Sequence, residues 1–75
     1  MGRMLETASA VIDELGGTGA VARLTGKLPS SVSNWRQENR LPSDTFYALT
    51  VALADRGKEA PRSLWRMIEP QQAAQ

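Results

Sequence analysis

Glycine and proline divide this chain into short segments, and their positions are the sequence feature that most restricts the possible folds. The breaks fall at Gly16-Gly17, Gly26, Pro29, Pro42, Gly57 and Pro61. Glycine commonly follows the last turn of a helix, whereas proline is accepted at the first helical position and avoided in the interior. With 75 residues there is room for one domain with one small core.

Apolar residues between the breaks recur at helical spacing. No segment alternates convincingly between apolar and polar residues, so strands are not expected. We predict an all-α fold, a small bundle of five helices, with residues 1–69 as the domain and 70–75 as a disordered tail. The five helices are expected at about residues 4–15, 18–26, 29–38, 43–57 and 60–68, with Thr18 and Ser43 as N-caps.

The composition excludes several classes of function. The chain has no cysteine and no histidine, which removes disulfides, thiolate metal sites and the commonest general base. No cofactor, metal or enzymatic activity is expected, because the serines have no base to activate them. No apolar run reaches the ~18 residues that cross a bilayer. We expect a cytoplasmic protein that associates with the nucleoid.

One predicted helix is unusual in composition. In the stretch "TGKLPSSVSNWRQENRLP", Pro29 is followed by short polar residues that are mediocre helix formers. Val32 and Trp35 are spaced to share one face, and we expect both in the core. Four basic residues against Glu38 give residues 22–40 a net charge of +3, so the basic excess of the chain is concentrated here.

Gly17, Gly19 and Ala22 formally match the dinucleotide-binding pattern GxGxxA. That pattern requires a preceding strand within a parallel sheet, and here a helix precedes it. The glycines are therefore interpreted as punctuation between helices.

The segment "GGTGAVARLTGKLPSSVSNWR" has the spacing of two helices joined by a tight turn. It resembles the lambda Cro and repressor-like helix-turn-helix family of phage and bacterial regulators over the first half to two-thirds of the chain. The residues that carry the resemblance are Ala22, Gly26, Pro29, Val32, Ser33 and Trp35. The chain departs from the family at Thr25 and Lys27, where apolar residues are usual, and we expect Leu24 and Leu28 to fill the core instead.

The resemblance implies a sequence-specific transcriptional regulator, a repressor, which binds double-stranded DNA with the helix that starts at Pro29. Short side chains on its outer face suit the reading of base edges in the major groove. The expected base contacts are Ser30, Ser31, Ser33, Asn34 and Gln37. The expected phosphate contacts are Thr18, Gly19, Arg23, Lys27, Arg36 and Arg40.

A single helix-turn-helix covers few base pairs, so a homodimer on an inverted repeat is expected, and a second regulatory protein is a further candidate partner. Apolar residues surplus to a small core indicate the dimer surface: Phe46, Tyr47, Leu64, Trp65, Met67 and Ile68. For Trp65, the core and the interface remain equally good interpretations. The alternative function is a protein-binding adaptor, such as an antitoxin or a polymerase-associated factor.

Overall fold

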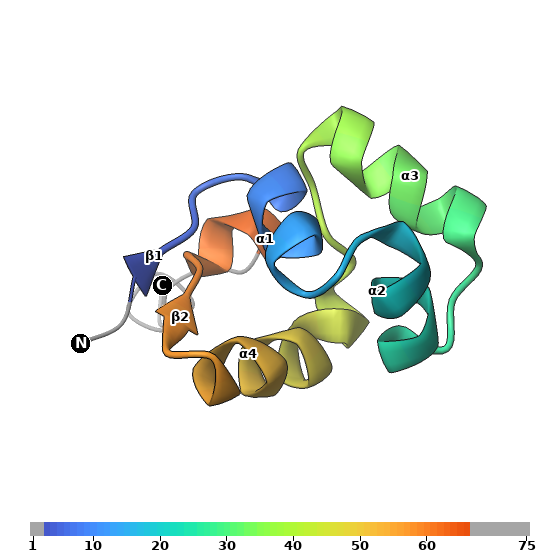
Figure 1. Ribbon diagram of the computed structural model, residues 1–75. Helices are drawn as coiled ribbons and strands as arrows, with labels where there is room; N and C mark the ends of the chain where they lie inside the picture. Colours follow the sequence, from blue (N-terminus) through green and yellow to red (C-terminus); the bar gives the residue numbers. More distant parts are fainter. Residues whose placement is uncertain (1–2, 67–75) are drawn as a thin grey trace.

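The structure is a computed structural model that describes residues 3–66. Its elements (Figure 1) follow the order β1 (Arg3–Met4), α1 (Ala8–Glu14), α2 (Thr18–Thr25), α3 (Pro29–Glu38), η1 (Ser43–Thr45), α4 (Phe46–Asp55), β2 (Lys58–Glu59) and η2 (Arg62–Trp65). The fold is mainly helical, as predicted. Within this part of the chain there are four α-helices, so the predicted count of five is wrong.

The first helix starts later than predicted, because residues 3–4 pair with a distant segment. β1 and β2 form a parallel pair in which Arg3 lies opposite Lys58 and Met4 opposite Glu59, and the Leu5 amide donates to the Glu59 carbonyl at 2.6 Å. α1 then begins at Ala8, where Thr7 is the N-cap and its side chain accepts from the Ala10 amide at 3.1 Å. The expectation of no strands is therefore also wrong for these two short segments.

The last predicted helix is a short 3₁₀ turn in the described residues. η2 covers Arg62–Trp65, and Arg66 ends it with a left-handed φ of 59°. The Leu64 carbonyl accepts from the Leu41 amide at 2.7 Å, so the segment is tied to the loop before η1. The predicted continuation to Ile68 and the predicted tail at 70–75 lie outside the described residues.

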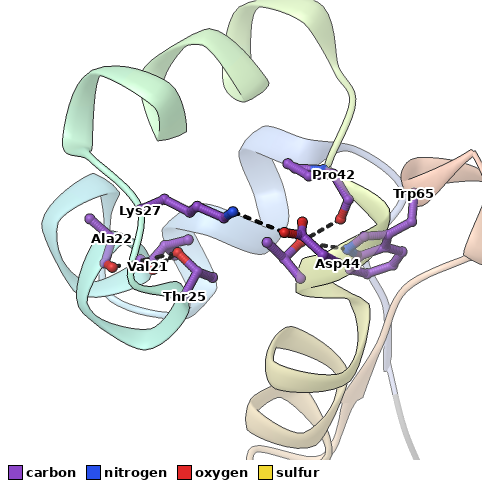
Figure 2. Close-up of polar contacts among 8 residues, drawn as sticks. Val21, Ala22, Thr25, Lys27, Pro42, Asp44 and Trp65 are labelled. Atoms are coloured by element: carbon purple, nitrogen blue, oxygen red, sulfur yellow. Dashed lines mark hydrogen bonds and ion pairs between the residues drawn. The ribbon is translucent and has the colours of Figure 1, made fainter.

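The core lies between the four α-helices and η2. Trp35 and Trp65 belong to it, with exposed fractions of 8% and 1%. Trp65 packs edge-on against Phe46 with ring centroids 5.1 Å apart. Its Nε1 donates to the hydroxyl of the buried Thr45 at 3.2 Å, the dashed line that starts at the indole in Figure 2. The other buried apolar residues are Ala8, Val11, Ile12, Leu15, Val21, Ala22, Val32, Leu41, Leu49, Leu53 and Leu64.

The turn between α1 and α2 corrects one predicted cap. Gly17 is the N-cap of α2 and Thr18 is its first residue, so Thr18 does not cap the helix. The predicted cap at Ser43 is also wrong, because Ser43 is the first residue of η1 and the N-cap of α4 is Thr45. Gly16 and Gly17 both have positive φ, at 108° and 98°. A Cβ on Gly16 would lie 3.0 Å from the Cβ of Ala20, so this position also needs glycine for the close approach of α2.

Over residues 3–66, no helix is both long and apolar enough to cross a membrane.

Candidate nucleic-acid interface

α3 begins and ends as its sequence predicts. Pro29 occupies the first turn, where its missing amide hydrogen leaves no hydrogen bond unmade. Asn39 ends the helix in the left-handed conformation, with φ of 54°. Its side chain also accepts from the Ala8 amide at 2.8 Å, so the end of α3 caps the start of α1. This contact fixes the C-terminal end of α3 on the body of the protein.

The two faces of α3 differ in composition, and this division is confirmed. Val32 and Trp35 are buried, at 0% and 8% exposure, and hold the helix against the core. Five polar residues are exposed. One of them, Glu38, is charged and lies at the border of the face; at 3.6 residues per turn the four uncharged ones fall within an arc of about 100° opposite the buried pair. They are Ser30, Ser33, Asn34 and Gln37. Ser31 is half-buried at the edge of this face.

The turn between α2 and α3 is closed by backbone hydrogen bonds. Gly26 has a φ of 73°, and the amides of Gly26 and Lys27 both donate to the Ala22 carbonyl, at 2.9 and 3.2 Å. The Thr25 hydroxyl donates to the Val21 carbonyl at 2.8 Å (Figure 2). Thr25 is therefore held by its own helix instead of contributing an apolar side chain.

Leu24 and Leu28 do not fill the core, and the expectation that they would is wrong. Leu24 is 46% exposed and Leu28 is 68% exposed. The core on this side is already formed by Val21, Val32 and Trp35. Both leucines are therefore left on the surface beside the turn.

Lys27 has an intramolecular partner. Its Nζ lies 2.9 Å from Oδ2 of Asp44 in η1 (Figure 2). Both side chains are accessible, so this pair is of the exposed kind that contributes between zero and about 1 kcal/mol and exchanges with other partners. Lys27 therefore reaches a phosphate only by leaving Asp44.

Arg36 is directed toward the protein body, which differs from its expected role at a phosphate. Its Nη1 donates to Ser9 at 2.8 Å and to Asp13 at 2.9 Å, and its Nη2 lies 3.5 Å from the Thr18 hydroxyl. The arginine thus joins α3 to α1 and to the first residue of α2. Three of its donors are thus engaged on this inner side, where they restrain α3, and the expected phosphate contact stays a prediction.

At the start of α2, backbone amides that have no carbonyl partner within the helix lie next to a cation. Gly19 is exposed, and a Cβ placed on it would lie 3.9 Å from Nη1 of Arg23. The guanidinium of Arg23 therefore lies over the first turn of α2, where the helix dipole favours anions. Thr18 is half-buried beside it and, as a hydroxyl acceptor for Arg36, still has its own proton to donate.

The cations of this region divide into two groups. Lys27 and Arg36 are paired with acids, whereas neither Arg23 nor Arg40 forms an ion pair among residues 3–66. Both Arg23 and Arg40 are exposed. They are the cations most available to an external anion.

The expected dimer surface is corrected in part. Leu64 and Trp65 are 4% and 1% exposed, so they belong to the chain's own core and are not available to a partner. Phe46 is half-buried against that core. Tyr47 is 79% exposed, and Met67 and Ile68 lie outside the described residues.

Sequence reasoning missed the residues that orient α3 from behind. Ser9 and Asp13 are four residues apart on α1 and so share a face, which was the available signal for a common partner. Asn39 follows the last helical residue, a place where asparagine often adopts the left-handed conformation. Its bond to Ala8 depends on tertiary packing and has no signal in the sequence.

Comparison of the chain with protein-family models, curated protein sequences and solved structures gave no match.

Proposed function

We propose that this chain is a sequence-specific DNA-binding regulator of the helix-turn-helix kind, a repressor, with α3 as the helix that enters the major groove. One observation carries the proposal. Along the arc opposite Val32 and Trp35, α3 presents only short or uncharged polar side chains, with the acidic Glu38 at the border of the arc, while the two buried residues anchor the helix from the other side. A surface of this kind approaches base edges closely and offers both donors and acceptors.

The residues of this arc have distinct roles in the proposal. Asn34 and Gln37 carry amides that pair with N6 and N7 of adenine. Ser30 and Ser33 donate hydrogen bonds to base edges or accept them from base edges. Ser31, at the edge of the arc, makes a further base contact.

We assign the phosphate contacts to groups that are exposed or that can leave their partner within the protein. Arg23 and the Gly19 amide together form an anchor at the start of α2, and Arg40 contacts the backbone beyond the end of α3. Thr18 adds a hydroxyl donor, and Lys27 joins by exchanging Asp44 for a phosphate. Arg36 acts by holding α3 in place.

The operator is an inverted repeat bound by a homodimer, because one α3 covers few base pairs. The outward face of α4 supports this assembly. Tyr47 and Val51 are one turn apart there, at 79% and 45% exposure, and no charged residue occurs before Asp55 in this helix.

The same face of α4 is the observation that favours a second candidate, a protein-binding adaptor. Such a protein captures its partner through α4 and shows no preference among duplexes.

The test is selection of bound duplexes from a random pool by the full chain. A palindromic enriched sequence supports the regulator and its symmetry together. Failure to enrich any sequence, at low as well as moderate salt, contradicts the proposal and favours the adaptor. Sedimentation of the chain alone and with the enriched duplex then measures whether two copies bind.

A further inference from the structure

Leu28 is an exposed aliphatic side chain at the beginning of α3. It is the N-cap residue, its backbone is extended, with φ of −79° and ψ of 148°, and its exposed fraction is 68%. Pro29, which follows it, is also exposed. Two consecutive exposed residues at the start of α3 are therefore apolar, between the polar Lys27 and Ser30, whereas the surface further along carries Asn34 and Gln37.

The position of Leu28 is fixed by the turn on one side and the helix on the other. Gly26 and Lys27 are hydrogen-bonded to the Ala22 carbonyl, and Pro29 restricts the following backbone. The Val32 amide donates to the Leu28 carbonyl at 3.1 Å, as the first bond of the helix. Leu28 is thus presented from a restrained backbone, which reduces the entropy lost when its side chain meets a partner.

We propose that Leu28 contacts the 5-methyl group of a thymine in the major groove. This inference rests on the proposed function and adds a specificity-determining residue to it. When a helix of this kind lies in the groove, its N-terminal residues approach the base edges. Thymine alone among the four bases offers a methyl group there, and an apolar side chain is its natural contact.

The experiment compares thymine with uracil, which differ only in that methyl group. The probe is the duplex enriched from the random pool, with each thymine replaced in turn by deoxyuridine, and binding is measured by competition. We expect the unmodified chain to bind one substituted duplex about fourfold more weakly, which corresponds to one buried carbon. Leu28→Ala is expected to bind the thymine and uracil forms equally.

Leu24→Ala is the matched control. Leu24 is also an exposed leucine, at 46%, but it lines a groove between α2 and α4 with Leu15 and Ala52. This variant is expected to keep the discrimination of the unmodified chain. Loss of discrimination in both variants would indicate a general effect on the fold and would contradict the assignment to Leu28.

Other outcomes separate the inference from the proposed function. The inference is overturned if no uracil substitution weakens binding, or if Leu28→Ala discriminates as well as the unmodified chain, the result expected when Leu28 meets a protein partner. In that case an enriched duplex that remains sensitive to Asn34→Ala leaves the proposed function intact. If no duplex is enriched, both fail.

Discussion

The guanidinium of Arg36 lies 2.9 Å from the carboxylate of Asp13, so an ion pair joins α3 to α1. The same group also donates to Ser9 and approaches Thr18, so it contacts both preceding helices. Because α3 packs through only two buried side chains, Val32 and Trp35, this polar contact restrains its rotation on the core. The orientation of the exposed arc thus depends on a residue that is not part of it.

Replacement of Arg36 by alanine is expected to lower the free energy of unfolding by about 1 kcal/mol, since the hydrogen bonds to Ser9 and Asp13 are lost from a partly exposed site. Denaturation by urea measures this change. In an Asp13→Ala background the same replacement is expected to cost less, because the ion pair is already absent. Fully additive effects would contradict the coupling.

The paired replacement Asn34→Ala and Gln37→Ala is expected to reduce discrimination between the enriched duplex and random DNA by about 1–3 kcal/mol for each lost contact. Both residues are exposed, so the free energy of unfolding is expected to stay within about 0.5 kcal/mol. Competition binding measures the loss of discrimination, and denaturation measures the free energy of unfolding. A variant that keeps full discrimination would show that another surface reads the sequence.

Removal of Arg23 or Arg40 is expected to weaken binding to all duplexes alike, because phosphate contacts carry little sequence information. The slope of log affinity against log salt should become shallower by about 0.9 for each lost phosphate contact, and so by about 1.8 when both protomers of the dimer carry the replacement. Arg56→Ala is the control, since Arg56 lies at the end of α4, 3.7 Å from Glu14. An equal loss in that variant would point to general electrostatic attraction instead of these two contacts.

Thr45→Val is expected to destabilise the fold by about 1–3 kcal/mol, because it leaves the buried indole N–H of Trp65 without its acceptor. Thr50→Val is the control. The Thr50 hydroxyl donates to the Phe46 carbonyl within α4, so removal of this hydroxyl leaves no buried donor without an acceptor. Comparable costs for both variants would show that the Trp65 contact has no special weight.

The parts of the fold that follow from local signals could be predicted from the sequence. Pro29 marks the start of α3, Gly26 ends α2, and the spacing of Val32 and Trp35 gives the buried face. Each of these signals acts within a turn or two of the chain. The polar arc, and with it most of the candidate site, follows directly from them.

The features that could not be predicted depend on segments far apart in the sequence. β1 replaces the first turn of the expected helix because Lys58–Glu59 lies beside it. Arg36 is drawn toward Asp13 by the packing of α1, and Leu28 stays exposed because other side chains already fill the core. Charge alone does not distinguish an arginine that contacts a phosphate from one that joins two helices of its own chain. Hydropathy alone does not distinguish a buried leucine from an exposed one.

The pairing of β1 with β2 has a consequence for the order of folding. Its partners are separated by almost the whole described chain, so their contact incurs a large loop-closure entropy, whereas the contacts between α2 and α3 are local in sequence. On a ribosome, Arg3–Met4 emerges long before Lys58–Glu59 exists. We therefore expect the helical pair to assemble first and the parallel strands to pair in a late step.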